Sequence, residues 1–267
     1  MKVLIKIGGT LLDSPEKVRS IATQLASVES EHQIVVVHGG GKEVTRFLAE
    51  KGVESRFQNG LRVSDATVID AVIKVIAGTV NKRLVTALTA KGQAAMGLSG
   101  VDGLLTRAVQ LDGSLEFVGR PISTDGKLLD LLVTSGYLPV VACVAGDEQG
   151  NIYNVNADVM AVSVALGWRA SKLFFLTDVP GVKNQMGSLL PELTSAGIDQ
   201  LVRSGVATGG MQAKLEAAHE ALANGVEVVI SSGSEPRIIP KLLAGEASGT
   251  RLVRTRPAEQ IAGAEKQ

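Results

Sequence analysis

Five short runs of β-branched and aliphatic residues recur along this sequence, and each is followed by apolar residues at helical spacing. Short, uninterrupted apolar runs are typical of strands that are buried on both faces of a parallel sheet. Parallel neighbours need a crossover connection, which is usually a helix. The alternation therefore predicts an α/β fold with an open, mainly parallel central sheet sandwiched by helices. The five runs lie at residues 3–7, 34–37, 138–143, 173–176 and 226–230.

Two segments interrupt this pattern with turn-forming pairs, Asn59-Gly60 within residues 53–63 and Asp112-Gly113 within residues 104–118. We expect both to be β-hairpins inserted in the α/β frame. A domain boundary is expected near Ala170, where a second set of strand, glycine-rich turn and helix begins. Helical periodicity is clearest at residues 18–28, 44–48, 68–77, 80–90, 128–133, 159–166 and 211–223.

Charge and composition exclude several classes of partner. The 27 acidic and 27 basic residues balance, so we expect neither nucleic acid nor an anionic membrane to bind. The single cysteine, Cys143, lies in an apolar run and is expected to be a buried thiol. The sequence begins directly at a strand-like segment, without a signal-peptide layout or a stretch of transmembrane length. We therefore expect a cytoplasmic protein.

Glycine clusters follow the first two predicted strands, as KIGGT at residues 6–10 and HGGGK at residues 38–42. Ligands of open parallel sheets bind at the carboxyl edge of the strands, where glycines let backbone N–H groups approach phosphate or carboxylate oxygens. One such cluster is an ordinary tight turn, but two in neighbouring units favour an anion site. Neither matches the phosphate loop G-x-x-x-x-G-K-[ST] or the dinucleotide pattern G-x-G-x-x-G.

Lys6 lies between Ile5 and Ile7 in a strand that is expected to be buried. An ammonium group there is costly unless an anion meets it, which favours a functional lysine. An edge-strand lysine that reaches solvent is the alternative, because Lys2 lies on the same face.

Polar residues also cluster next to other predicted strands and helices. Asn156 and Asp158 precede an apolar helix and, taken alone, are typical helix caps. Lys214 lies in the first turn of a helix that starts after TGGM at residues 208–211, where a lysine opposes the helix dipole and suggests an anion. Arg62 follows a tight turn and either clamps a substrate carboxylate or is a solvated surface arginine.

In this order and spacing, the segments resemble the amino acid kinase family, and within it the members that phosphorylate N-acetyl-L-glutamate in arginine biosynthesis. The resemblance covers essentially the whole chain; single motifs are weak, but the ordered set is specific. The matching segments are KIGG (6–9), HGGG (38–41), NGLRV (59–63), NK (81–82), GLSGVDG (97–103), GYLPV (136–140), NVNAD (154–158), TDVPGV (177–182) and GGM (209–211), with Lys214.

The resemblance implies an acceptor-substrate and dimerisation lobe at residues 1–170 and a nucleotide-binding lobe at residues 171–267. Lys6 and Lys214 would stabilise the transferring phosphoryl group, and Asp158 would hold both lysines. Acetylglutamate would be bound by Gly40, Gly41, Arg62 and Asn154. The nucleotide would be bound by Gly8, Gly9, Thr177, Asp178, Val179, Gly181, Val182, Thr208, Gly209, Gly210 and Met211.

The chemistry agrees with this assignment. A γ-carboxylate is already ionised at neutral pH, so its attack on ATP needs no general base, and His38 is then expected to be structural. Magnesium would accompany ATP and bridge its phosphates, and no protein metal-ligand set is expected. The product would be N-acetylglutamyl 5-phosphate.

Two alternatives remain. One is a sibling kinase that acts on a carrier-protein-linked aminoadipate or glutamate carboxylate. The other is a non-catalytic amino-acid or nucleotide sensor on the same fold; retention of Lys6, Asp158 and Lys214 disfavours it. Ring-forming, arginine-inhibited members of the family carry an extra helix before the first strand, whereas this sequence begins at that strand. We therefore expect an arginine-insensitive homodimer.

Overall fold

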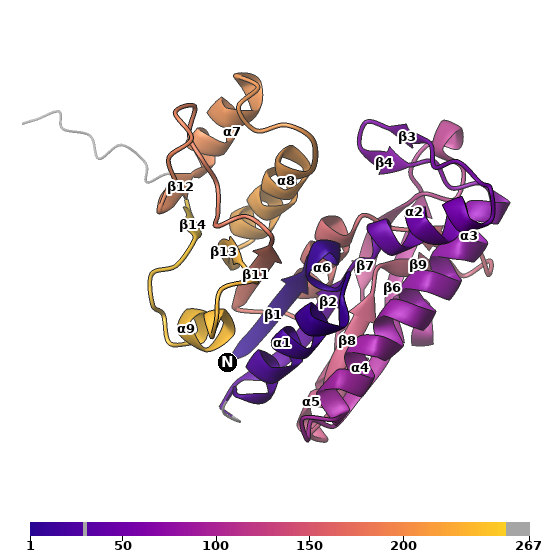
Figure 1. The fold of residues 1–267 in the computed structure, drawn as a ribbon, viewed down its shortest axis with the longest axis horizontal. Coiled ribbons are helices and arrows are strands. Elements are labelled where there is room, and N and C mark those ends of the chain that lie inside the picture. Colours follow the sequence, from indigo (N-terminus) through magenta and orange to yellow (C-terminus); the bar gives the residue numbers. More distant parts are fainter. Residues whose placement is uncertain (29–30, 255–267) are drawn as a thin grey trace, which may run out of the picture.

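The computed structural model describes residues 1–28 and 31–254, and its centre is an eight-stranded sheet (Figure 1). Neighbouring strands are parallel throughout, except for the antiparallel pair β13 and β14. The predicted α/β fold with a mainly parallel sheet is therefore confirmed. In spatial order the strands are β12 (Glu192–Thr194), β14 (Thr250–Val253), β13 (Glu227–Ser232), β11 (Lys172–Thr177), β1 (Lys2–Ile7), β2 (Gln33–His38), β8 (Leu138–Ala142) and β5 (Ala95–Ser99).

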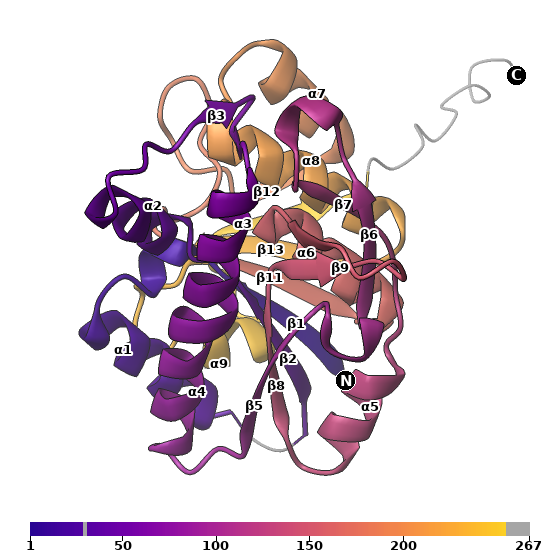
Figure 2. The ribbon, with the colours of Figure 1, turned by 90° about the vertical axis from the view of Figure 1, so that its right-hand side faces the viewer.

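Helices cover both faces of this sheet, with α1 and α4 on one side and α5 and α6 on the other (Figures 1 and 2). None of the described helices is long and apolar enough to cross a lipid bilayer. The helices are α1 (Pro15–Ala26), α2 (Gly41–Glu50), α3 (Ala66–Val72), α4 (Asn81–Thr89), α5 (Lys127–Thr134), α6 (Ala157–Gly167), α7 (Ser195–Arg203), α8 (Gly209–Ala223) and α9 (Ile238–Leu243), with short 3-10 turns η1 (Gly9–Leu11), η3 (Asp102–Leu104) and η4 (Gly113–Leu115).

The sequence predicts two helices at residues 68–77 and 80–90, but the structure joins them into one rod. Its middle is η2 (Ile73–Val80), a stretch of π-helix that runs from α3 directly into α4. Pi-helical segments are rare and frequently lie at functional sites. This one faces the site described below.

Two smaller sheets carry the inserted hairpins. The first predicted hairpin is confirmed as β3 (Phe57–Gln58) and β4 (Leu61–Arg62). The bounds predicted for the second, residues 104–118, are wrong, because β6 (Thr106–Gln110) pairs with β7 (Gly119–Thr124) across a longer connection. Asp112 and Gly113 begin the 3-10 turn η4 instead of forming a two-residue turn. Strands β9 (Val144–Gly146) and β10 (Ile152–Asn154) complete this four-stranded sheet.

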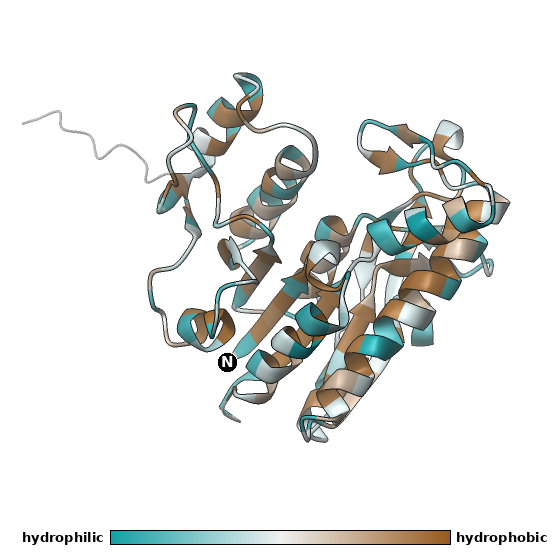
Figure 3. Ribbon diagram, in the orientation of Figure 1, coloured by the Kyte–Doolittle hydropathy of each residue, from teal (hydrophilic) through white to brown (hydrophobic). Residues whose placement is uncertain are grey.

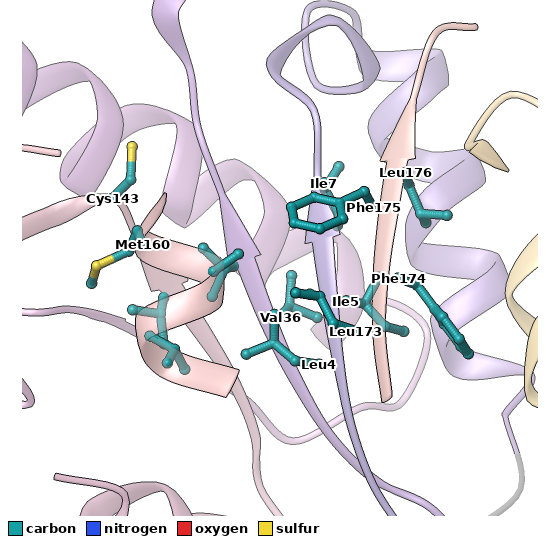
Figure 4. Packing of buried hydrophobic residues seen from close by; sticks show 14 of the residues in the cluster. Leu4, Ile5, Ile7, Val36, Cys143, Met160, Leu173, Phe174, Phe175 and Leu176 are labelled. Atoms are coloured by element: carbon teal, nitrogen blue, oxygen red, sulfur yellow. The ribbon is translucent and has the colours of Figure 1, made fainter. Parts of the chain in front are cut away.

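The core is built from aliphatic side chains on the central strands, with few aromatic rings. Leu4, Ile5 and Val36 are fully buried beside Leu173 and Phe174 (Figure 4). Burying each such side chain contributes about 1.5–3 kcal/mol. Hydrophobic residues are concentrated on the central strands, whereas α1, α2 and α4 turn hydrophilic residues outward (Figure 3).

Strand register brings the functional loops to one edge. Ile7, the last residue of β1, pairs with His38 at the end of β2 and with Leu176 near the end of β11. His38 pairs in turn with Ala142, the last residue of β8. Both glycine clusters and the turn that follows β11 therefore leave the sheet side by side.

Candidate active site

The candidate active site is a cavity of about 250 Å³ at this carboxyl edge. It is lined by residues of the two glycine loops, of the β3–β4 hairpin and of the first turn of α6. A larger hollow of about 730 Å³ between α1 and α4 contains none of the predicted site residues, so chemistry and not size locates the site. The predicted residues that line the cavity are Lys6, Gly9, Gly40, Gly41, Arg62, Asn154 and Asp158.

Lys6, Asp158 and Lys214 form a buried charge cluster. The Nζ atom of Lys6 lies 2.7 Å from Oδ1 of Asp158. Lys214 donates to both carboxylate oxygens of Asp158, at 2.8 and 2.9 Å. Each of the three residues is at most 8% exposed. The structure thus brings together all three predicted catalytic residues, which lie more than 50 positions apart in the sequence.

The cluster holds two cations against one anion. Burial by itself favours the neutral acid, but the adjacent ammonium groups of Lys6 and Lys214 lower the pKa of Asp158 to about 2. Burial, reinforced by the neighbouring charge of Lys6, lowers the pKa of Lys214 to about 8, although Asp158 acts in the opposite direction. A buried group with an excess of positive charge is costly on its own and favours a bound anion.

Local structure explains how these side chains reach one another. Asn156 caps α6, accepting hydrogen bonds from the backbone N–H groups of Asp158 and Val159. The sequence left open whether Asn156 and Asp158 are both caps; only Asn156 is, and Asp158 is free to turn toward the lysines. Lys6 points to the α6 side of the sheet, as Lys2 does; Lys2 meets Asp130 there. Lys214 arrives from α8 and lies over the ring of Phe175, 5.1 Å from its centroid.

Activity should fall at alkaline pH because Lys214 must carry its proton to act on an anion. With its pKa near 8, kcat/KM is expected to decrease about tenfold per pH unit above that value. Unfolding does not explain such a loss. Between pH 8 and 10.5 the unfolded chain binds more protons at this lysine than the folded chain does, so this group makes stability rise with pH.

A pH–rate profile checks this expectation, with circular dichroism recorded at each pH. The matched variant is Lys214→Arg, whose guanidinium stays charged throughout the range. Its residual activity should lack the alkaline limb. The same limb in the variant would assign the titration to another group.

Arg62 is 8% exposed and has no carboxylate partner among the described residues. Its guanidinium donates to Ser55 at 2.5 Å, to the carbonyl of Gly41 at 2.9 Å and to Thr45 at 2.8 Å. Phe57 stacks on it, with the ring centroid 4.7 Å away. The surface-arginine alternative is therefore wrong: the side chain is buried and fixed at the cavity wall. Three of the five N–H groups of an arginine are used, which leaves two for an anionic ligand.

Asn154 lies at the end of β10, on the other side of the cavity. Its amide donates to Ser64 at 3.0 Å, and the hydroxyl of Ser64 donates to the carbonyl of Arg62 at 2.8 Å. Ser64 therefore ties the hairpin that carries Arg62 to the strand that carries Asn154. Among the described residues no donor meets the carbonyl oxygen of the Asn154 side chain, so this oxygen can accept from a ligand N–H.

Apart from Gly8 and Gly9 of the first glycine loop, the residues expected to bind nucleotide lie outside the lining of this cavity, in the loop after β11 and at the start of α8. Gly9 faces Gly40 and lines the cavity. Val182 is 1% exposed and its backbone N–H donates to the hydroxyl of Thr250, so this residue anchors the loop. Gly209 has a φ of 53°, a left-handed conformation that suits glycine, at the first residue of α8. Gly8, Thr177, Asp178, Val179, Gly181, Thr208, Gly210 and Met211 belong to the same two segments or to the first glycine loop.

Sequence reasoning missed the residues that hold Arg62. Thr45 comes from α2, Phe57 from the hairpin and Ser55 from the connection between them, and no local motif marks these residues. Only the hairpin register, which places Phe57 opposite Arg62, signals the stacked ring. Within residues 1–28 and 31–254, no cluster of three or more His, Cys, Asp or Glu side chains is arranged to hold a metal ion.

Comparison with known proteins agrees with this geometry. Residues 1–232 match the sequence profile described as "Amino acid kinase family". The chain is 52% identical to the acetylglutamate kinase of Solibacter usitatus over 255 residues, covering 95% of this chain and 99% of that protein. It is 40% identical to the acetylglutamate kinase of Bartonella quintana, covering 94% and 89%. A solved N-acetylglutamate synthase of Neisseria gonorrhoeae, complexed with coenzyme A and N-acetyl-glutamate, shares the fold with a TM-score of 0.84 at 24% identity, over 96% of this chain and 60% of that one.

Proposed function

This chain belongs to the amino acid kinase family, and we propose that it transfers the terminal phosphoryl group of ATP to the γ-carboxylate of N-acetyl-L-glutamate, in arginine biosynthesis. A carboxylate oxygen attacks the γ-phosphorus while the bond from that phosphorus to the bridging oxygen breaks. The products are N-acetyl-L-glutamyl 5-phosphate and ADP. The relatives named acetylglutamate kinase, matched over nearly their whole length, support this acceptor.

One observation carries the proposal: two buried lysines meet a single carboxylate next to a cavity with a fixed arginine. Attack by an already ionised carboxylate requires no general base, and the cavity lining includes no histidine. The obstacle is repulsion between two anions and the charge on the transferring group. Positive charge and backbone N–H groups that are held in place beforehand lower such a barrier.

The roles follow from position. Lys6 and Lys214 stabilise the phosphoryl group while it is transferred, and Asp158 holds both ammonium groups in position. Arg62 binds a carboxylate of the acceptor through its two remaining N–H groups, and Asn154 accepts from the acetamido N–H. Gly40 and Gly41 offer backbone N–H groups. The loop after β11 and the start of α8 bind ATP, and Mg²⁺ is held mainly by the phosphates.

A coupled ADP-release assay tests the acceptor, with hydroxylamine added to trap the acyl phosphate. We expect turnover with N-acetyl-L-glutamate and at least about 100-fold less with L-glutamate or N-acetyl-L-aspartate. L-glutamate lacks the acetamido N–H from which Asn154 would accept a hydrogen bond. N-acetyl-L-aspartate is one methylene too short for its side-chain carboxylate to reach the lysines. Folded protein that gives no hydroxamate with any of the three would rule out a free acceptor and favour a carrier-linked carboxylate or a sensor.

The organisation of the chain follows from this proposal. Residues 1–170 form the acceptor and dimerisation lobe and residues 171–267 the nucleotide lobe, with the division falling between α6 and β11. Residues 255–267 of this assignment lie outside the described residues. Strand β5 is the last strand of the eight-stranded sheet, so one of its edges is open for pairing with a second copy. We propose a homodimer on this basis, working in the cytoplasm where ATP is supplied.

A further inference from the structure

His38 and Asn81 form a buried pair directly behind the second glycine loop. Both residues are 0% exposed. The Nδ2 atom of Asn81 lies 3.0 Å from Nε2 of His38, and Nδ1 of His38 lies 2.9 Å from the carbonyl oxygen of Gly39. Neither side chain has a role in the reaction described above. Two wholly buried polar side chains are kept in a core only when their hydrogen bonds are made.

The surroundings of Asn81 fix which way its amide points. Its nitrogen donates to the carbonyl of Val140 at 2.9 Å, and a carbonyl only accepts. Its oxygen accepts from the ammonium of Lys82 at 3.1 Å, and an ammonium only donates. The second N–H of the amide faces Nε2 of His38 at 3.0 Å and, at a longer 3.4 Å, the carbonyl of Leu98. Because an amide nitrogen only donates, the Nε2 atom of His38 must be the acceptor.

This orientation decides the tautomer of the imidazole. With Nε2 accepting, the proton is on Nδ1, which donates to the carbonyl of Gly39. Burial lowers the pKa of His38 to about 4, and the charge of Lys82 acts in the same direction, so the ring is neutral at pH 7. Lys82 thus donates to Asn81, Asn81 donates to His38, and His38 donates to the carbonyl of Gly39.

The hydrogen bond from His38 to the carbonyl of Gly39 also fixes the direction of the N–H of Gly40. A trans peptide is planar, and its oxygen and hydrogen point in opposite directions. Because the oxygen of Gly39 is turned toward His38, the N–H of Gly40 is turned away from His38, in a loop of which Gly39, Gly40 and Gly41 all line the cavity. Within the part of the chain that the structure describes, this N–H donates to no protein acceptor.

Close packing keeps the pair in this arrangement. A Cβ atom at Gly97 would lie 1.9 Å from Oδ1 of Asn81, so the neighbouring strand makes room for this amide. A Cβ atom at Gly40 would lie 3.2 Å from Val80 and 3.4 Å from Ile76, which belong to the π-helix η2. Asn81 is the residue at which that π-helix ends and α4 begins.

We propose that His38 and Asn81 are positioning residues that orient the Gly39–Gly40 peptide, so that the Gly40 N–H points at the anionic oxygens of the acceptor carboxylate. The inference rests on the proposed function and adds to it how this N–H is aimed. It also gives His38, expected from the sequence to be merely structural, an effect on the reaction.

Two variants of the same residue separate positioning from packing. His38→Asn places an amide nitrogen near the position of Nδ1, so it keeps a donor for Gly39 and loses the contact with Asn81. His38→Gln places its amide near Nε2, so it keeps the contact with Asn81 and loses the donor for Gly39. Both remove the ring and should lower the melting temperature similarly. His32→Gln, at the opposite end of β2, is the control and should leave kinetics unchanged.

Steady-state kinetics with ATP and N-acetyl-L-glutamate give the first readout. We expect His38→Gln to lower kcat/KM for the acceptor about tenfold, the size of one lost hydrogen bond. His38→Asn should lose no more than about threefold, and KM for ATP should barely move in either. Equal losses in the two variants, in step with their melting temperatures, would overturn the proposal.

The second readout does not depend on the reaction. Nitrogen-15 NMR of the three histidines in the wild-type protein should show one ring protonated at Nδ1 and unprotonated at Nε2 throughout pH 6 to 8. If no ring shows this state, so that His38 is protonated at Nε2, the proposal is overturned even if turnover is normal. If acetylglutamate is not a substrate but the Nδ1–H ring is found, the proposed function fails while the oriented peptide stands.

Discussion

Replacing Lys214 with methionine is expected to lower kcat for phosphoryl transfer by at least about 100-fold, and Lys6→Met should do the same. Methionine keeps most of the length of the side chain and removes its charge. The two ammonium groups, 2.7 and 2.8 Å from the same oxygen of Asp158, provide positive charge where negative charge moves during transfer. Loss of one such electrostatic group costs about 10²–10³ in kcat. KM for either substrate should change much less, because the effect is greatest in the transition state.

The same substitutions should leave the folded state at least as stable. The cluster holds two cations against one anion, and the pKa of Lys214 is lowered because burial and Lys6 both disfavour its charge. Removing one ammonium leaves a balanced pair, and apolar replacements of buried charges are often neutral or stabilising. Thermal unfolding measured beside the kinetics checks this. A variant that loses activity only in proportion to a large drop in melting temperature would show that the lysine is structural.

Local sequence pattern predicts some strands of the large sheet and not others. The five strands recognised in the sequence are those with continuous apolar runs, and all lie in the large sheet. The strand β5, with the sequence AMGLS, has no such run, and its Gly97 is required by the side chain of Asn81 in another element. The strands β12 and β14 are short and partly polar, and form only through pairing with one another and with β13. Their existence depends on tertiary contacts, which periodicity does not contain.

The features of the site also divide into those that the sequence predicts and those that depend on tertiary contacts. Lys6 is predictable because it stands near the end of a central parallel strand, at the sheet edge where ligands bind. The roles of Arg62 and Asn154, which lie on β4 and β10 of the two smaller sheets, come from family resemblance. The sequence does not reveal that Arg62 is buried, that Ser64 joins it to Asn154, or that His38 faces Asn81. These depend on side-chain direction and on the π-helix, which shifts the register of a long helix. The nucleotide segments, taken from family resemblance, remain predictions.

Replacing Asp158 with asparagine is expected to destabilise the protein by about 3–5 kcal/mol, the cost of leaving buried charges without their partner. The carboxylate is nearly inaccessible and, with its pKa near 2, is ionised throughout the working range. Asparagine keeps its shape and removes its charge, so the ammonium groups of Lys6 and Lys214 would repel each other in a buried space. Chemical denaturation at pH 7 gives the free energy of unfolding, and activity should be largely lost because the lysines move apart.

A double variant separates this repulsion from any packing defect. In Asp158→Asn combined with Lys6→Met, one buried ammonium remains, so much of the lost stability should return although two native contacts are gone. Residues in direct contact are those for which such double-mutant cycles give large coupling terms. Simple additivity of the two single changes would show that the carboxylate does not act as a counterion. Inorganic phosphate offers an independent check: if the two lysines form an anion site that Asp158 occupies in the resting protein, phosphate should raise the melting temperature of Asp158→Asn more than that of the wild type.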